Sequence, residues 1–268
     1  MTASSLIQIK GKLDRLYRRF HHRRYVHPDP LVFLYRYPNL EDRELVGIIA
    51  ASLAYGRVAQ IIKSIQTVVA ILDPSPCRNL RFTPTSLLRR RLGGFVHRFA
   101  TDRHMVGLLS GARGILQQYG SLKNGFLDGW DDGDPTVQPA LSAFVDLLKS
   151  AGAHKAGHLL PDPRKGSASK RLHLFLRWMV RQDRIDPGGW CQVPASKLLI
   201  PLDVHMHRVS VGLGLTQRRQ ADLKTVMEVT AGFRAMVPKD PVRYDFVLSR
   251  LGIRADMHTD AFLADGDR

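Results

Sequence analysis

Asp203 is a residue whose type and position in the sequence suit chemistry. It stands in the N-cap position of a predicted helix that reaches about Gly212. A carboxylate there accepts backbone N–H bonds and lies at the positive end of the helix dipole, and both effects keep it ionised at neutral pH. Beside a sugar, an ionised carboxylate can stabilise the oxocarbenium-like state that forms as an N-glycosidic bond breaks. The alternative is that Asp203 only caps its helix, which is common for Asp in this setting.

The sequence around Asp203 resembles a known family. The runs concerned are 200–209 (IPLDVHMHRV), 213–215 (LGL) and 244–252 (YDFVLSRLG). They resemble the helix-hairpin-helix DNA glycosylase superfamily of endonuclease III over residues 165–252, and more narrowly a bacterial branch of it. Asp203 matches the Asp of the family's base-excision pocket and His205 matches its His, whereas Val204 replaces the usual Thr. The resemblance implies excision of a base that is flipped out of duplex DNA.

Lys170 is the nucleophile that this resemblance implies, because bifunctional members use a Lys to attack C1′ of the sugar and form a Schiff base. The Leu-Pro-Gly-Val-Gly hairpin of endonuclease III-like proteins is missing here. In the archaeal 8-oxoguanine glycosylases, however, the Lys lies farther upstream, as Lys170 does at 33 positions before Asp203 (203 − 170). The helix start and the cations Arg164, Lys165 and Arg171 favour the neutral amine that attack requires. The alternative is a solvated surface Lys, and Lys165 is the second candidate.

Several residues near these two positions are candidates for contact with DNA. They are Gly166, Ser167, Ser169, Arg171, His205 and Arg208. The backbone N–H groups of the string 166–169 suit a DNA phosphate in place of the missing hairpin, although the same string is also an ordinary capping turn.

Tyr55 and Arg57 are candidates at a distance in the sequence. They lie where superfamily members carry side chains that fill the gap left by an extruded base, and an aromatic with a cation suits that role. The alternative is an interhelical turn. Trp178 and Trp190 suit stacking on the flipped base, although large aromatics at helical spacing more often belong to a core.

Helices are the elements that would position these residues. Apolar residues at offsets of three and four predict a helix pair over Asp42–Leu72, broken near Tyr55-Gly56-Arg57. Further helices are predicted over Ala140–Leu148, Lys170–Arg181, Asp203–Gly212 and Asp222–Met236, and from near Pro241. The Lys170–Arg181 helix has one apolar stripe, with Arg171, Arg177 and Arg181 elsewhere on its surface.

Strand signals are sparse, so we predict an all-α fold. The resemblance implies a two-lobed helical DNA glycosylase-like form of it, with a cleft between the lobes. Residues 1–268 are expected to form a single globular unit. Its approximate lobes are 30–160, with the helix pair Leu45–Leu72, and 161–268, with Lys170 and Asp203.

The charge of the chain favours a polyanionic partner. Lys and Arg number 40 against 24 Asp and Glu, for a formal net charge of +16. We predict double-stranded DNA as the partner of a monomer. The alternatives are a ribosome-associated protein, or a protein that is basic only because its genome is rich in GC.

No cofactor is predicted. Cys77 and Cys191, the only cysteines, cannot build a disulfide framework, a four-cysteine zinc site or an iron–sulfur cluster. His205 and His207 do not predict a metal site with Asp203, because offsets of two on a helix do not share a face.

The sequence also predicts a cytoplasmic, nucleoid-associated protein. The segment Met1–Lys12 lacks an apolar core of signal-peptide length, and Lys or Arg interrupts the longer apolar runs before they could span a bilayer.

The function expected from these patterns is a DNA glycosylase that excises a damaged base, with an additional AP-lyase activity through Lys170; the archaeal likeness suggests an oxidised purine as the base. The principal alternative is a non-catalytic DNA- or RNA-binding protein that retains the fold. A structural partner in a repair or ribosomal complex is the third class.

Overall fold

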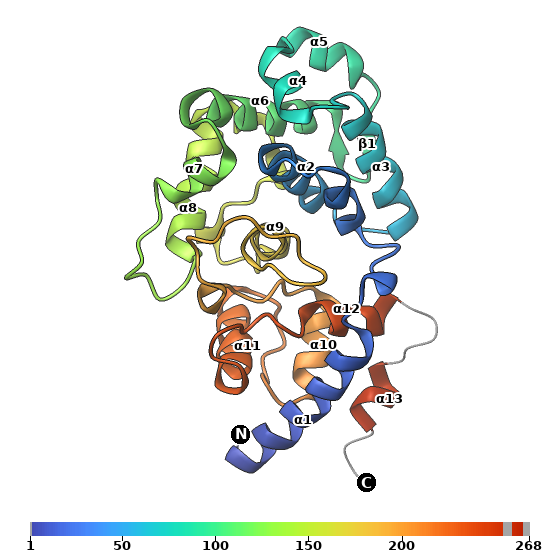
Figure 1. Ribbon diagram of the computed structural model, residues 1–268, viewed down its shortest axis with the longest axis vertical. Helices are drawn as coiled ribbons and strands as arrows, with labels where there is room; N and C mark the ends of the chain where they lie inside the picture. The colour runs from blue at the N-terminus through green and yellow to red at the C-terminus, as the bar shows by residue number, and fades with distance from the viewer. Residues whose placement is uncertain (1, 254–258, 265–268) are drawn as a thin grey trace.

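Helices dominate the computed structural model, which describes residues 2–253 and 259–264 (Figure 1). The α-helices are α1 (Ala3–Phe20), α2 (Leu40–Ser52), α3 (Val58–Ala70), α4 (Pro76–Phe82), α5 (Thr85–Arg91), α6 (Asp102–Tyr119), α7 (Leu122–Leu127), α8 (Gln138–Ser150), α9 (Lys170–Val180), α10 (Val204–Gly212), α11 (Leu223–Met236), α12 (Asp245–Ile253) and α13 (Thr259–Ala264). Short 3₁₀ turns lie at Arg23–Tyr25, Pro30–Arg36, Ala153–Lys155, Gly157–Leu159, Pro163–Lys165 and Ala195–Lys197.

In the described part of the chain, the one β-sheet is a hairpin of two strands, each two residues long. Its strands are β1 (Val96–His97) and β2 (Ala100–Thr101). They are antiparallel, with Val96 opposite Thr101 and His97 opposite Ala100. The mostly helical fold expected from the sequence is therefore confirmed.

Most of the predicted helices are present. The predicted helix pair appears as α2 and α3, and the helices predicted over 140–148, 170–181, 203–212 and 222–236 appear as α8, α9, α10 and α11. The last predicted helix, α12, begins at Asp245 rather than near Pro241. Helices α1, α4, α5, α6, α7 and α13 were not predicted.

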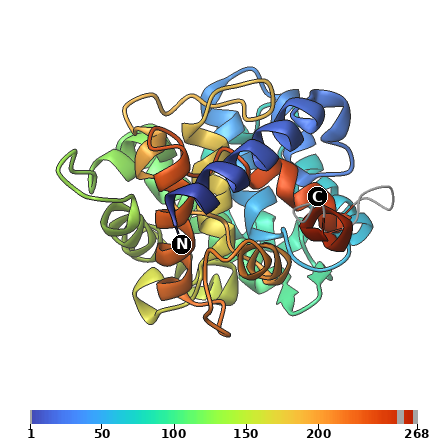
Figure 2. The ribbon, with the colours of Figure 1, turned by 90° about the horizontal axis from the view of Figure 1, so that it is seen from below.

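Helices α2 and α9 lie at the centre of the molecule and pack against each other (Figure 1). Every residue of α2 from Glu44 to Ser52 is buried. On one side of this pair, α6 packs against α4, α5, α7 and α8. On the other side lie α10, α11 and α12, and α1 runs across that end of the molecule, in dark blue in Figure 2. Helix α9, which begins at Lys170, thus lies between these two groups of helices.

Arg177 of α9 and Arg181, the C-cap residue of α9, are buried, which corrects the prediction that they lie on the helix surface. Their side chains are 3% and 4% exposed. Nη2 of Arg177 lies 2.8 Å from Oδ1 of Asp186, and Nη2 of Arg181 lies 2.7 Å from Oδ2 of Asp183. Charged side chains that face away from the apolar stripe of α9 therefore meet carboxylates instead of water, and the Asp186 carboxylate is itself fully buried.

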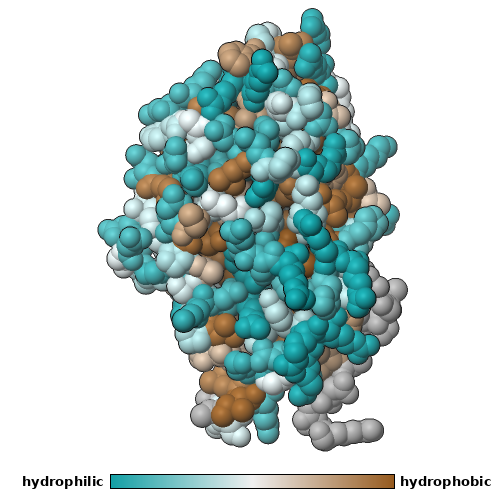
Figure 3. Space-filling model, viewed as in Figure 1, coloured by the Kyte–Doolittle hydropathy of each residue, from teal (hydrophilic) through white to brown (hydrophobic). Residues whose placement is uncertain are grey.

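The apolar core runs through the whole described fold, from Leu13 to Leu251, as one contiguous cluster. Trp178 and Trp190 are 0% exposed and belong to this core, so neither presents a face to a ligand. Among the described helices, none is long and apolar enough to cross a membrane. The face seen in Figure 3 is mostly hydrophilic, with small scattered hydrophobic patches.

Glu44 is a buried carboxyl at the centre of α2. The Trp190 Nε1–H donates to its Oε1 over 2.9 Å, and the Lys123 N–H donates to its Oε2 over 3.2 Å. Burial raises the pKa of Glu44 to about 7, although these hydrogen bonds oppose the rise. The ionised form is therefore costly in the folded protein.

Replacing Glu44 by Gln is expected to flatten the dependence of stability on pH. The pKa in the folded state, about 7, lies above the unfolded value of 4.5. The contribution of Glu44 is thus fully present below about pH 4.5 and is lost as the pH rises through about 7, a loss of about 3 kcal/mol. Urea unfolding at several pH values between 5 and 8 measures the difference in slope between wild type and Glu44→Gln.

Glu41→Gln is the matched control, since Glu41 lies on the same helix with a side chain that is 48% exposed. It should keep the wild-type slope. Parallel curves for wild type and Glu44→Gln would show that Glu44 does not titrate in this range.

Candidate active site

Lys170 and Asp203 form an ion pair between the starts of two helices. Nζ of Lys170 lies 3.0 Å from Oδ2 of Asp203. Asp203 is the N-cap of α10, and its Oδ1 accepts the Met206 N–H over 2.8 Å. The two carboxylate oxygens therefore have different partners, one in the helix and the other on α9. Both side chains keep contact with solvent, at 31% and 39% exposed.

The charge state of Asp203 follows from these contacts. Partial burial raises the pKa of the Asp203 carboxyl, but the Lys170 ammonium and the Met206 N–H together lower it by more. The net pKa lies below the usual value for Asp. A carboxylate is thus present at this position at neutral pH.

The ion pair borders a cavity of about 500 Å³. Its walls come from the α2–α3 turn, the exposed end of α9, the start of α10 and the helix α12. The lining residues are Asp29, Pro30, Ala54, Tyr55, Gly56, Val58, Ile61, Lys170, Arg171, Leu174, Arg177, Pro201, Asp203, Val204, His205, Met206, Asp245, Ser249, Arg250 and Gly252. A volume of this order suits a small organic ligand, and the mix of apolar walls with a few charged groups is typical of a binding site.

His205 lies in this cavity beside Asp203. Its Nε2 is 2.9 Å from the Leu248 carbonyl oxygen, which fixes the ring between α10 and α12. The ring packs so closely on Gly252 that Nδ1 stands 2.5 Å from where a Cβ would be, so only glycine fits there. His207 faces elsewhere, since its Nε2 lies 2.8 Å from the Arg218 carbonyl oxygen. In the described residues, no group of three or more His, Cys, Asp or Glu is arranged to hold a metal ion.

Tyr55 and Arg171 form another wall of the same cavity. The Tyr55 hydroxyl donates to the His97 carbonyl oxygen over 3.1 Å and lies 3.0 Å from Nε2 of His158. The guanidinium of Arg171 lies 4.9 Å from the centre of the Tyr55 ring, and its Nη1 donates to the Ser52 carbonyl oxygen over 2.9 Å. These contacts fix the Tyr55 side chain in the wall.

Two buried ion pairs in the cavity were not predicted from the sequence. Nη2 of Arg250 lies 2.5 Å from Oδ2 of Asp29, and Nη1 of Arg177 bonds Oδ2 of Asp245. Burial raises the pKa of the Asp245 carboxyl, although Arg177 opposes the rise. The sequence held one indication of these ion pairs, which is their position. Asp245 and Arg250 both lie in the run 244–252 that carries the family resemblance.

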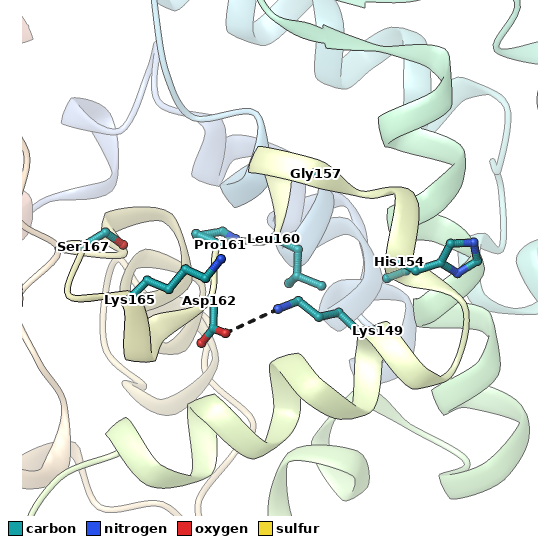
Figure 4. A pocket seen from close by; sticks show the side chains of 9 residues that line it. Lys149, His154, Gly157, Leu160, Pro161, Asp162, Lys165 and Ser167 are labelled. Atoms are coloured by element: carbon teal, nitrogen blue, oxygen red, sulfur yellow. Dashed lines mark ion pairs between the residues drawn. The ribbon is translucent and has the colours of Figure 1, made fainter.

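Gly166 and Ser167 lie outside this cavity. Ser167 borders a second cavity of about 410 Å³ together with Lys149, Asp162 and Lys165 (Figure 4). There, Nζ of Lys149 lies 3.8 Å from Oδ2 of Asp162. Gly166 is exposed, whereas the Ser169 side chain is 6% exposed.

The charges around Lys170 differ from the sequence prediction. Lys165 lines the second cavity, and Arg164 pairs with Asp146 over 2.7 Å. Arg171 is directed at Tyr55 and at backbone carbonyl groups. The cations expected to surround Lys170 are thus engaged elsewhere, and its ion-pair partner is the Asp203 carboxylate.

Arg57 and Arg208 are exposed and do not line the cavity. Arg57 is the N-cap residue of α3, and Arg208 lies on α10. The site residues that the structure brings together are therefore Lys170, Asp203, His205, Arg171 and Tyr55.

The fold and the site together define a mostly helical protein with a Lys–Asp pair in a cavity. The chain belongs to the DUF2400 family, a family of proteins of unknown function, whose model matches residues 29–254. Every residue that lines the cavity, from Asp29 to Gly252, falls within this match. No curated protein and no solved structure matches the chain.

Proposed function

We propose that this protein is a DNA glycosylase that excises a damaged base from duplex DNA and cleaves the strand through a Schiff base. The observation that carries the proposal is the 3.0 Å Lys170–Asp203 pair at the edge of a cavity of about 500 Å³. A cavity of this size is sufficient for a nucleobase that has been flipped out of the duplex. Base excision requires this extrusion, because the glycosidic bond cannot be reached inside the stack. The family resemblance of the runs around Asp203 supports the same assignment.

In this proposal the helices form the two-lobed glycosylase arrangement, with DNA bound across the cavity mouth. The helix pair α2–α3 belongs to one lobe, and α9, α10 and α12 belong to the other. The formal charge of +16 supports binding to a polyanion. Arg57 and Arg208, which are exposed outside the cavity, are proposed to contact DNA phosphates.

The chemistry assigns one role to each member of the pair. Lys170, as the neutral amine, attacks C1′ of the deoxyribose, and the C1′–N bond to the base breaks with its electron pair leaving on the base. The sugar ring then opens to a Schiff base on Nζ, and loss of a C2′ proton to solvent expels the 3′ phosphate, which cleaves the strand. The Asp203 carboxylate first stabilises the positive charge that develops at C1′ and, once the new C1′–N bond has formed, accepts a proton from Nζ of Lys170.

A non-catalytic DNA- or RNA-binding protein is the second candidate. The observation that favours it is the same ion pair, because a Lys and an Asp at two helix starts also fasten α9 to α10 without any chemistry. In that case the cavity would hold a nucleotide without excising its base.

Borohydride trapping distinguishes the two functions. Wild-type protein incubated with borohydride should form a covalent complex with duplexes that carry 8-oxoguanine or an abasic site, because borohydride reduces a Schiff base to a stable amine. The measurement is a shifted band on a denaturing gel. A duplex with a tetrahydrofuran abasic analogue is the control, since it lacks the aldehyde and cannot be trapped.

Two other outcomes are informative. Base release without trapping would be consistent with Asp203 as the catalytic carboxylate and would exclude Lys170 as the nucleophile. If a panel of oxidised, alkylated and deaminated bases gave no base release and no trapping, the glycosylase assignment would be contradicted. The binding function would then remain.

A further inference from the structure

The tip of the β1–β2 hairpin presents an aromatic side chain to solvent. Phe99 is 73% exposed, although Phe is usually among the buried residue types. Arg98, beside it in the tip, has the left-handed backbone angle φ of 53°, and its guanidinium carbon lies 5.5 Å from the centre of the Phe99 ring. Across the described ranges, Arg98 has no carboxylate partner. The tip therefore offers an aromatic face and an unpaired positive charge together.

This hairpin is fastened to the rim of the cavity. Arg98 packs on Gly56, a lining residue with φ of +99°, where a Cβ would stand 2.7 Å from Cδ of Arg98. His97 and Tyr55 are joined twice, by the Tyr55 hydroxyl on the His97 carbonyl oxygen and by His97 Nε2 at 3.0 Å from the Tyr55 carbonyl oxygen. Phe99 thus stands on a support that is continuous with the cavity wall.

The support is also rigid. The His97 side chain is 0% exposed, and its Nδ1 lies 2.9 Å from Oγ of Ser64 on α3. On the other side, β2 runs directly into α6, whose N-cap is Thr101. Because the hairpin is held at both ends, its backbone presents Phe99 from a fixed position, which lowers the entropic cost of binding.

We propose that Phe99 inserts into the base stack of DNA beside the cavity and occupies the gap from which the target nucleotide leaves. Arg98 contacts the adjacent backbone phosphate. This inference rests on the proposed function for its partner, duplex DNA. It replaces Tyr55, which the sequence suggested for this role, because Tyr55 is fixed in the cavity wall whereas Phe99 is free to enter a stack.

Binding to a duplex that already contains a gap tests the proposal. The probe is a duplex with one tetrahydrofuran abasic analogue, compared with the intact duplex of the same sequence. Phe99→Ala should weaken binding to the gapped duplex by roughly tenfold, the loss expected for one stacking contact, and change binding to the intact duplex by less than about twofold. Phe99→Trp should retain wild-type binding to both.

Phe82→Ala is the matched control, because Phe82 is 79% exposed at the end of α4 and does not line the cavity. It should leave both affinities unchanged. A 2-aminopurine base opposite the analogue should change its fluorescence on binding of wild type and of Phe82→Ala, but much less with Phe99→Ala.

Wild-type binding of Phe99→Ala to the gapped duplex, or an equal loss on both duplexes, would overturn the proposal. The tetrahydrofuran analogue can be neither excised nor trapped, so this result is independent of catalysis. A protein that neither releases a base nor is trapped, but loses its preference for the gapped duplex in Phe99→Ala, would keep Phe99 as the inserted side chain and lose the glycosylase assignment. If wild type is trapped but Phe99→Ala binds both duplexes as wild type does, the glycosylase assignment would stand and the role of Phe99 would be wrong.

Discussion

Lys170→Gln is expected to abolish borohydride trapping on abasic DNA. Gln has a similar length and polarity but no nucleophilic amine, so no Schiff base can form. Affinity for DNA should stay close to that of wild type, because one cation among the 40 Lys and Arg residues is lost. Trapping yield and equilibrium binding, measured on the same abasic duplex, separate loss of chemistry from loss of binding.

Lys165→Gln is the matched control for this experiment. Lys165 lies five positions before Lys170 (170 − 165) and borders the second cavity rather than the one with Asp203. It should trap like wild type. If Lys165→Gln lost trapping while Lys170→Gln kept it, the nucleophile would be Lys165, and the ion pair with Asp203 would have only a structural role.

Asp203→Asn is expected to slow base excision by about 100-fold or more in single-turnover assays, the order of loss that follows removal of an electrostatic contact in a transition state. Asn keeps an oxygen that can accept the Met206 N–H, so the cap of α10 should survive and the melting temperature should change little. The negative charge opposite Lys170 is lost. The rate constant for base release and the melting temperature are the two measurements.

Asp222→Asn controls for the capping role. Asp222 caps α11 in the same way, accepting the Thr225 N–H over 2.9 Å, and it does not line the cavity. This variant should excise at the wild-type rate. If Asp203→Asn excised the base as fast as wild type, the role of Asp203 would be limited to capping α10.

The helices that the sequence predicted are those whose signals are local. Helices α2 and α3 have apolar residues at offsets of three and four, and α10 and α11 begin at the capping residues Asp203 and Asp222. Helix α6 was missed because glycines interrupt its apolar stripe, and α1 because few of its residues are buried. Both helices depend on packing partners that the local pattern does not encode.

The site was predictable in part for the same reason. Lys170, Asp203 and His205 follow from the family resemblance, and they meet in one cavity. The ion pairs of Arg177 with Asp245 and of Arg250 with Asp29 join residues 68 and 221 positions apart. No local pattern identifies such partners. Arg177 was therefore placed on the surface, where an unpaired Arg normally lies.

The charge around Lys170 depends on direction as well as sequence distance. Arg164 and Lys165 are close to Lys170 in the chain, yet Arg164 turns toward Asp146 and Lys165 lies at another cavity. Side chains a few positions apart can point to opposite sides of a turn, so neighbours in sequence did not define the field at the amine.

In the proposed reaction, Lys170 leaves its ion pair with Asp203 to bond with the sugar, and the two carboxylate oxygens of Asp203 would then behave differently. Oδ1 remains tethered to the amide of Met206, so the torsion of the carboxylate stays fixed while Oδ2 is vacated. The negative charge then faces the place that the cation has left, without turning and without waiting for solvent to rearrange. The N-terminus of α10 thus holds one carboxylate oxygen in place, and the other oxygen would face the reacting sugar in a preset orientation.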